Sequence, residues 1–462
     1  MKPVLLIDFG STYTKVTAVD VDAPRLLGVA SAYTTVETDI NDGLSEALRR
    51  LEAAVGKLEF SERYAASSAA GGLRMMASGL VPELTAEAAR LASLGAGAKV
   101  VKTYAFELTE DDVREIVAEN PDIFLLVGGT DGGNKQCIIN NARMLAAAGG
   151  SFPIIIAGNR NAARECERIL AGRDTHICEN VLPKFGVLNI APTQQQIRDT
   201  FLKNIIRAKG LSRASELVSG ILMPTPSAVI RAVELLANGT YTEAGIGELL
   251  AVDVGGATTD VYSAAHGNPR RPNTVIRGLA EPFIKRTVEG DIGMRYSVKG
   301  IVDAAGIDEV ARRSGLTVER AQELVSYLSE HTDALPSDDE LERLDEALAG
   351  LAVKTAVARH AGRIEETYTM FGLSFVQSGK DLTGVTNLVV TGGSLVHTRH
   401  TARIAACALY DAQEPDSLRP EHAKILVDRK YIISAMGLLS GCYPDAALTI
   451  MKEELEQDGI GE

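Results

Sequence analysis

The sequence is poor in three features that mark common classes of protein. Its five cysteines, at positions 137, 166, 178, 407 and 442, form no CxxC pair and no zinc-site spacing with histidine, and their odd number argues against a disulfide framework. No run of about eighteen apolar residues is present that could cross a bilayer. Acidic residues outnumber basic ones by 61 to 47, which leaves no excess positive charge for a phosphate backbone or an anionic membrane. We therefore expect reduced thiols and no binding to nucleic acid or membranes.

The composition is that of an ordinary folded protein. The 462 residues are 45% hydrophobic and 23% charged, and a chain of this length is expected to form two or three domains with a large buried interior. The chain enters a strand by residue 4 with no basic and apolar leader before it, so a cytoplasmic location is expected.

The order of predicted elements indicates an α/β protein. Short apolar runs predict strands at 4–9, 15–20, 26–32, 63–68, 99–105, 123–127 and 153–157. Helical periodicity predicts helices over Gly43 to Val55, Glu83 to Leu94, Glu110 to Glu119, 193–207 and 215–237, the last interrupted near Pro224 and Pro226. Strands that alternate with helices are typical of a sheet covered by helices. Residues 295–370 are mostly helical in pattern, and Ser337 is placed to begin a helix there as its N-cap.

Two segments repeat one pattern, and a third varies it. Residues 5–15, LLIDFGSTYTK, and residues 250–263, LAVDVGGATTDVYS, each read as an apolar strand, an aspartate, a glycine-containing turn and hydroxyl residues. Residues 389–397, VVTGGSLVH, place a Gly-Gly-Ser turn after a β-branched run. Glycine lets a backbone fold tightly against a ligand, so three such turns in one chain favour a phosphate-containing ligand.

A nucleoside triphosphate with magnesium requires two kinds of group. Its phosphates need converging backbone N–H and hydroxyl groups, and its metal ion keeps most of its waters and needs nearby carboxylates. The acids are Asp8 and Asp253, and donors follow at Gly10, Ser11, Thr12, Gly255, Gly256 and Thr258. Lys15 adds a positive charge for a phosphate, unless it is a solvated strand lysine. The uncharged Gly392, Gly393 and Ser394 suit the nucleoside end.

The three motifs in this order resemble the phosphate-1, phosphate-2 and adenosine motifs of the actin, sugar-kinase and heat-shock chaperone ATPase superfamily. PTPSAVIRA at 224–232 and SAMGLL at 434–439 resemble its two connecting helices. The resemblance implies two actin-like (ribonuclease H-like) lobes around an ATP cleft, with magnesium held through water by Asp8 and Asp253. It implies that Asp253 orients the attacking nucleophile and that phosphates contact Ser11, Thr12, Tyr13, Lys15 and Thr258.

A narrower resemblance covers nearly the whole chain. The opening PVLLIDFGSTYTKVTAVD, the segment AAGGLRMMASGLVPELTAEAARLASLGAGAKV, and LLVGGTDGGNK with IIIAGNRNAA are similar to the glutamate mutase L family. That resemblance implies a slow ATPase that assembles or reactivates an adenosylcobalamin-dependent mutase or aminomutase. No Asp-x-His-x-x-Gly cobalamin motif occurs here, so the vitamin is expected on the partner enzyme.

The expected organisation has an actin-like lobe at 1–245 with an extra α/β segment at about 60–190. A second lobe follows at 246–462, with the helical insertion at about 295–370.

Some alternatives stay open. Asp260 is either a third acid over the phosphates or a cap at the sheet edge. The glycine-rich stretch 125–135 is either a ligand loop or a tight connection from strand to helix. At the level of function, a small-molecule kinase on the same fold and a nucleotide-controlled filament or scaffold are rivals to the accessory ATPase. The oligomeric state is also open, a homo-oligomer being one alternative.

Overall fold

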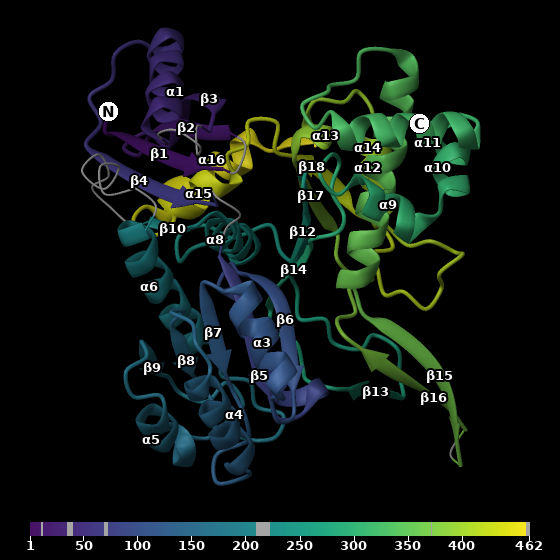
Figure 1. Cartoon of the computed structure of the whole chain (residues 1–462). Helices are drawn as coiled ribbons and strands as arrows, with labels where there is room; N and C mark the ends of the chain where they lie inside the picture. Colours follow the sequence, from purple (N-terminus) through teal and green to yellow (C-terminus); the bar gives the residue numbers. More distant parts are fainter. Residues whose placement is uncertain (11–12, 35–39, 69–72, 209–221, 371, 459–462) are drawn as a thin grey trace. The chain divides into compact units, whose positions relative to one another are not determined.

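The computed structural model describes residues 1–462 apart from 11–12, 35–39, 69–72, 209–221, 371 and 459–462 (Figure 1). The predicted phosphate ligands Ser11 and Thr12 thus lie outside the described residues. The chain forms two compact units. Unit 1 comprises Met1–Ala232, Gly278–Ala280 and Ser434–Ile450, and unit 2 comprises Val233–Arg277, Glu281–Ile433 and Met451–Glu462.

The first sheet of unit 1 is mixed and has the order β10-β4-β1-β2-β3. Its strands are β1 (Pro3–Phe9), β2 (Tyr13–Asp20), β3 (Arg25–Tyr33), β4 (Glu62–Ser67) and β10 (Leu222–Pro224). Every residue of β1 is buried, as a continuous apolar run in a central strand predicts. The helices α1 (Ile40–Val55), α6 (Ala191–Ala208), α8 (Thr225–Asn238), α15 (Ile433–Leu439) and α16 (Pro444–Glu454) belong wholly or partly to this unit.

The extra α/β segment of unit 1 forms a second, wholly parallel sheet with the order β6-β5-β7-β8-β9. The strands are β5 (Arg74–Gly79), β6 (Lys99–Ala105), β7 (Ile123–Leu126), β8 (Ile154–Ile156) and β9 (Thr175–Ile177). Between them run a π-helix (Pro82–Ala86), α2 (Glu87–Gly95), α3 (Glu110–Glu119), α4 (Gln136–Ala147) and α5 (Arg160–Ile169). Alternate residues of β5 and β7 enter two different cores, so both faces of this sheet are covered.

The main sheet of unit 2 has the order β14-β12-β11-β17-β18-β19. Its strands are β11 (Leu249–Val254), β12 (Thr259–Ala264), β14 (Ile284–Glu289), β17 (Asn387–Thr391), β18 (Lys424–Val427) and β19 (Glu456–Asp458). A three-stranded sheet contains β13 (Thr274–Arg277), β15 (Arg363–Thr369) and β16 (Gly372–Ser378).

The helices of unit 2 include the insertion between β14 and β15 (Figure 1). The insertion consists of α9 (Val298–Ala305), α10 (Ile307–Ser314), α11 (Val318–Glu330) and α12 (Asp339–His360), which we call the helical subdomain. The short helices α13 (Gly393–Val396) and α14 (Thr401–Ala405) and a 3-10 turn (Ala406–Ala408) come after β17. Within the described part of the chain, no helix combines the length and the apolar run needed to cross a membrane.

The main sheets of the two units share one plan. In each, the first strand pairs antiparallel with the second, and the second pairs antiparallel with the third. The first strand also pairs parallel with the fourth, which pairs parallel with the fifth. The repeat seen in the sequence is therefore a repeat of topology. The predicted fold class is confirmed: two actin-like, ribonuclease H-like lobes, an additional α/β segment in the N-terminal half and a helical insertion in the C-terminal half.

Two local predictions are wrong. Residues 215–237 were expected to be helical, but Leu222–Pro224 is strand β10, which pairs with β4, and α8 begins only at Thr225. Pro226 suits the first turn of a helix, where its missing N–H has no partner to lose. Ser337 is not the N-cap of α12, because the side chain of Asp338 accepts the hydrogen bond from Leu341 N–H. Residues 215–221 lie outside the described residues.

The helices α8 and α15 cross at very close range within unit 1. A Cβ atom added to Gly437 of α15 would lie 1.8 Å from the carbonyl oxygen of Ala228 of α8. Only a residue without a side chain fits at such a crossing. Gly437 therefore allows α15 to pack directly on the backbone of α8.

We expect Gly437→Ala to lower the free energy of unfolding by about 1–3 kcal/mol, because the added methyl group would force α8 and α15 apart. Urea denaturation would measure the change. Gly350→Ala is the matched control in α12, where the added Cβ atom would meet its nearest neighbour, Cys407 Sγ, at 3.1 Å. We expect little loss there, since alanine favours the helix. Wild-type stability for Gly437→Ala would contradict the close crossing.

Candidate functional site

The first predicted acid, Asp8, lies near the end of β1 and is buried. Thr225 Oγ1 donates to its Oδ1 at 2.6 Å, and Ser434 Oγ donates to its Oδ2 at 2.9 Å. Thr225 is the first residue of α8 and Ser434 belongs to α15, so one hydroxyl from each crossing helix holds the carboxylate. Two hydrogen bonds to different oxygens fix the orientation of the carboxylate group.

The first glycine turn follows Asp8. The N–H of Gly10 donates to the carbonyl oxygen of Tyr13 at 3.1 Å, and a Cβ atom on Gly10 would lie 2.6 Å from that oxygen. Tyr13 is half exposed and its ring packs edge-on against Tyr33, with ring centroids 6.1 Å apart. Lys15 lies directly opposite Asp8 in the β1–β2 register, so the two side chains leave the same face of the sheet.

The second glycine turn follows Asp253 in β11 and is closed in the same way. The N–H of Gly255 donates to the carbonyl oxygen of Thr258 at 2.9 Å, which repeats the bond between Gly10 and Tyr13. The carbonyl of Gly256 accepts from the N–H groups of Arg295 at 2.8 Å and Tyr296 at 2.9 Å. The two turns therefore share a closing hydrogen bond, and the second is also supported by the chain at 293–296.

Asp260 occupies in unit 2 the place that Lys15 has in unit 1. It lies opposite Asp253 in the β11–β12 register. Asp260 pairs with buried Arg286 of β14 at 2.6 Å and accepts from Thr258 Oγ1 at 3.2 Å. Burial is the largest single influence and lowers the pKa of Arg286, but the attraction and hydrogen bonding of Asp260 and Tyr262 together outweigh it, so the pKa of Arg286 is raised. Asp260 is thus the ion-pair partner of Arg286, and it also contacts the second glycine turn through Thr258.

The Gly-Gly-Ser turn after β17 packs against the end of β11. Gly392 has φ of +100°, and a Cβ atom on it would lie 2.3 Å from the carbonyl oxygen of Val254. A Cβ atom on the exposed Gly393 would have the hydroxyl oxygen of Tyr431 as its nearest neighbour, at 3.9 Å. Ser394 belongs to α13 and is partly buried. The turn thus approaches the Asp253 strand through glycine backbone.

Two further polar residues gather at this end of the unit 2 sheet. Burial, together with the negative charges of Asp253 and Asp428, raises the pKa of Tyr431. Asp428 follows β18, is buried, and accepts hydrogen bonds from the N–H groups of Ile432 at 2.9 Å and Ile433 at 3.1 Å. The carboxyl ends of β11, β17 and β18 therefore bring two acids and a tyrosine close to the glycine turn.

The described site residues fall into two sets, one in each unit. Unit 1 holds Asp8, Gly10, Tyr13 and Lys15, and unit 2 holds Asp253, Gly255, Gly256, Thr258, Gly392, Gly393 and Ser394. The sequence reasoning missed Thr225, Ser434, Tyr431 and Asp428. A signal existed for Asp428, since ILVD at 425–428 is an apolar run ending in aspartate, like the two strands that were recognised.

The glycine-rich stretch 125–135 contains the end of β7 and the connection to α4. Asn180 Nδ2 donates to the carbonyl oxygen of Gly129 and to Asp131 Oδ1, both at 3.0 Å. Asn159 Nδ2 donates to the carbonyl oxygens of Gly133 and Asn134, both at 3.1 Å. Side chains that follow β8 and β9 thus hold this connection in one shape, as a tight connection from strand to helix requires.

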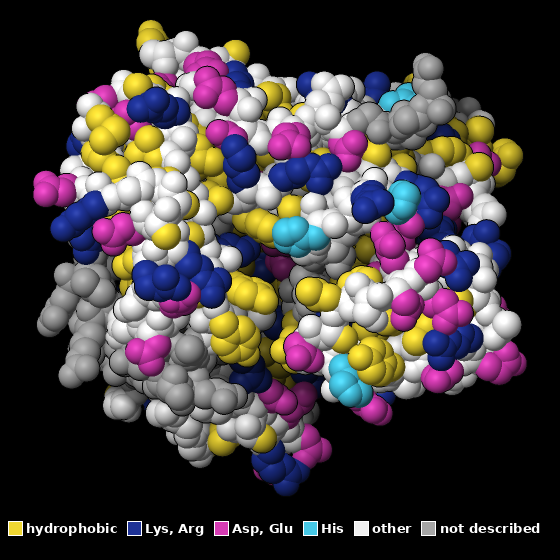
Figure 2. All heavy atoms as spheres, turned by 90° about the horizontal axis from the view of Figure 1, so that it is seen from above, with side chains coloured by type: hydrophobic (Ala, Val, Ile, Leu, Met, Phe, Trp, Pro, Cys, Tyr) yellow, Lys and Arg dark blue, Asp and Glu magenta, His cyan; other side chains and the backbone are white. Residues whose placement is uncertain are grey.

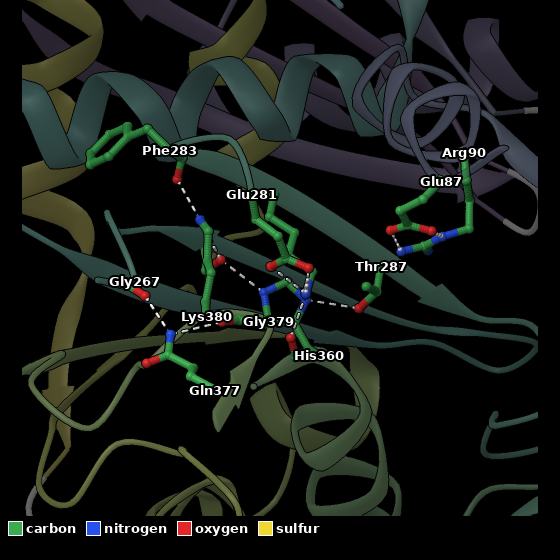
Figure 3. Close-up of polar contacts among 12 residues, drawn as sticks. Glu87, Arg90, Gly267, Glu281, Phe283, Thr287, His360, Gln377, Gly379 and Lys380 are labelled. Carbon is green, nitrogen blue, oxygen red and sulfur yellow. Dashed lines mark hydrogen bonds and ion pairs between the residues drawn. The ribbon is translucent and has the colours of Figure 1, made fainter. Parts of the chain in front are cut away.

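A cluster of buried polar side chains lies elsewhere in unit 2 (Figure 3). Lys380 Nζ donates to the carbonyl oxygen of Phe283 at 2.7 Å. Lys285 Nζ donates to Glu281 Oε1 at 2.9 Å and to the carbonyl oxygen of His360 at 2.7 Å. Burial is the main cause that lowers the pKa of Lys380 from 10.5 to about 7; Glu281 opposes this change and Lys285 adds to it.

One face of the molecule carries charged side chains of both signs. On the face that Figure 2 shows, acidic and basic side chains are interspersed, with apolar side chains between them. The net charge of −14 is therefore not concentrated into a single acidic region on this face.

Lys380 predicts a pH dependence of stability. The unfolded chain, with the ordinary pKa of 10.5, binds this proton more tightly than the folded chain, whose Lys380 pKa is about 7. The free energy of unfolding therefore gains a contribution that rises with pH between these values, by at most about 1.4 kcal/mol per pH unit, and is level below them. We expect Lys380→Met to lose this rise in urea unfolding, and the exposed Lys424→Met to retain it. The prediction is wrong if the difference in free energy of unfolding between wild type and Lys380→Met is the same at every pH in this range.

Comparisons with known proteins connect these features to a family. A family model described as MutL protein matches residues 4–455. Protein MutL of Clostridium tetanomorphum is 47% identical over 459 residues, which cover 98% of this chain and 99% of that protein.

Solved structures show a weaker likeness. Xylulose kinase from Lactobacillus acidophilus has 10% identity and a TM-score of 0.36, with 99% of this chain and 93% of that chain covered. A diol dehydratase-reactivating factor in nucleotide-free form has 10% identity and a TM-score of 0.35, with 96% and 100% covered. Likeness of this degree supports no statement about activity. The match to the family model over nearly the whole chain, with 47% identity to a curated relative, shows that this chain belongs to the MutL protein family, the glutamate mutase L family that its motifs resemble.

Proposed function

We propose that this chain is an ATP-binding and ATP-hydrolysing accessory protein that assembles or reactivates an adenosylcobalamin-dependent mutase or aminomutase. Membership of the glutamate mutase L family supports the association with a mutase. The observation that carries the nucleotide part is the repeated hairpin. In each unit a strand carries an aspartate at its end, and the glycine turn that follows is closed by the same backbone hydrogen bond.

The residues present fit a magnesium–triphosphate ligand. Asp8 is held by two hydroxyl groups and shares a sheet face with Lys15, which offers a carboxylate for metal-bound water beside a positive charge for a phosphate. Gly10 and Gly255 place no side chain at their turns, so phosphate oxygens can come close to backbone N–H groups there. In the proposal, Gly256 and Thr258 donate to phosphates, Gly255 shapes the turn because its own N–H bonds to the Thr258 carbonyl, and Gly392, Gly393 and Ser394 contact the nucleoside. Magnesium, when bound, would neutralise part of the charge on the triphosphate.

Asp8 and Asp253 act in the proposal as the acids that hold metal-bound water, and Asp253 also orients the attacking water. The two turns grip one triphosphate from the two units, so the closed arrangement binds it more tightly than the open one. A ligand shifts such an equilibrium only by the difference in its affinity for the two states. Loss of the γ-phosphate removes the group that both turns contact, and the units separate again.

The useful output in this proposal is a change in the partner. In the proposal, the mutase binds one arrangement of this chain more tightly than the other. Each cycle of closure and opening therefore shifts the mutase toward an open conformation, from which spent cobalamin leaves. Coupling of this kind is reciprocal, so the mutase also changes the affinity of this chain for nucleotide. ATP hydrolysis should therefore respond to the partner protein.

We expect Asp253→Asn and Asp8→Asn each to lower ATP turnover by about 100-fold or more, because metal and nucleophile positioning are each worth several kcal/mol. Steady-state phosphate release, with and without the mutase, measures this, and recovery of an inactivated mutase measures the output. Asp303→Asn, at an exposed aspartate of α9, is the matched control and should retain wild-type rates.

Three results would contradict the proposal. Wild-type hydrolysis and mutase recovery by Asp253→Asn would remove the role given to that acid. ATP consumption that depends on a small metabolite, with no response to the mutase, would indicate a kinase. Light scattering that grows with protein concentration and ATP would instead indicate a filament.

A further inference from the structure

The second glycine turn is built against a neighbouring stretch of backbone, residues 293–296. Met294 N–H donates to the carbonyl of Gly255 at 3.0 Å, and the N–H groups of Arg295 and Tyr296 both donate to the carbonyl of Gly256. A Cβ atom on Gly293 would lie 2.4 Å from the carbonyl carbon of Ala257, so the two backbones are in direct contact. The shape of the turn therefore depends on where residues 293–296 are held.

The side chain of Arg295 ties that stretch to the helical subdomain. Its Nη1 and Nη2 atoms donate to the two carboxylate oxygens of Asp345 at 2.9 and 2.8 Å, and its Nε donates to the carbonyl oxygen of Ala334 at 3.0 Å. Nη1 also donates to the carbonyl oxygen of Met294 at 2.7 Å. Both side chains of the ion pair are largely buried. A paired, planar guanidinium with all its nitrogens engaged allows little freedom of position.

Asp345 lies on α12, and α12 is fixed to the sheet that carries Asp253. At the C-terminal end of α12, His360 Nδ1 is 2.8 Å from Thr287 Oγ1 of β14, and His360 Nε2 is 2.8 Å from Ser263 Oγ of β12. Figure 3 shows His360 beside Thr287 in this buried cluster. Leucines of α12 share a core with Val252 and Val261 of the same sheet. The helix thus gives Arg295 a rigid point of attachment.

We propose that Arg295 is a positioning residue that couples the helical subdomain to the shape of the second glycine turn. This inference rests on the proposed function, because it gives that turn its regulation. Movement of the 331–338 connection that contains Ala334, or of the N-terminal end of α12 far from His360, shifts Arg295 and with it the amides that support Gly255 and Gly256. In return, a phosphate held by the turn favours one position of the helical subdomain.

The pair Arg320 and Glu340 provides an internal comparison. Glu340 also lies on α12 and pairs with Arg320 of α11 at 2.8 Å, but this pair is more than one-third exposed. Neither residue contacts residues 293–296 through any hydrogen bond or ion pair recorded among the described residues. Glu340→Gln therefore removes the same charge from the same helix without loosening the turn.

The experiment compares Asp345→Asn with Glu340→Gln by hydrogen exchange in nucleotide-free protein. We expect the amides of Met294, Arg295 and Tyr296 to exchange about tenfold faster or more in Asp345→Asn, because Arg295 loses its charged partner, and at the wild-type rate in Glu340→Gln. We also expect Asp345→Asn to lower kcat for ATP by about tenfold or more while the exchange of β11 and β17 stays unchanged. Arg295→Lys, which keeps a charge but loses the paired geometry, should fall between wild type and Asp345→Asn on both measurements.

Unchanged exchange at residues 294–296 in Asp345→Asn would overturn the coupling. Faster exchange with wild-type kcat would overturn the positioning role. If Asp345→Asn does not fold, Arg295→Lys decides both points by the same readouts. If the wild-type protein hydrolyses no ATP, the proposed function fails, and the exchange measurement still decides whether Arg295 couples the helical subdomain to the turn.

Discussion

One backbone hydrogen bond underlies both halves of the candidate site. In each main sheet the first strand ends near an aspartate, and the N–H of a following glycine bonds to the carbonyl three residues later. At Gly10 this closure leaves no room for a Cβ atom, which would lie 2.6 Å from the accepting oxygen. At Gly255 the same distance is 3.1 Å, which is tight but less strict. The bond lies where the second strand of the hairpin begins, and it keeps the aspartate beside the glycine turn. The same bond therefore forms the hairpin and places the candidate site residues.

The two hairpins have one topology and different electrostatics. In the strand register, Lys15 lies opposite Asp8 and Asp260 lies opposite Asp253. The negative charge of Asp260 is balanced by Arg286. Hydroxyl groups from α8 and α15 hold Asp8, while Asp253 shares its end of the sheet with Tyr431 and Asp428. Hairpins of one topology thus present a carboxylate beside a cation in unit 1 and a carboxylate in acidic surroundings in unit 2. Under the proposed function this division suits a ligand that carries both phosphate charge and a metal ion.

Glycines at close approaches connect these hairpins to the rest of each unit. Gly437 lets α15 reach the backbone of α8, so that Ser434 and Thr225 both reach Asp8. Gly392 brings the turn after β17 against Val254, and Gly293 brings residues 293–296 against the second glycine turn. In each case two stretches of backbone are in direct contact with no side chain between them. A small displacement of one stretch therefore displaces the other.

The sequence alone determined the strands that end in aspartate, the glycine turns, the α/β fold class and the family, because these depend on local patterns of apolar, acidic and glycine residues. It could not place Thr225 and Ser434 on Asp8, since these contacts join residues 217 and 426 positions apart. Nor could it find the tie between Arg295 and Asp345, or show that residues 222–224 form a strand, because sheet pairing and helix packing decide both. Local preference predicts which element a segment forms, and only the tertiary structure determines which distant side chains meet.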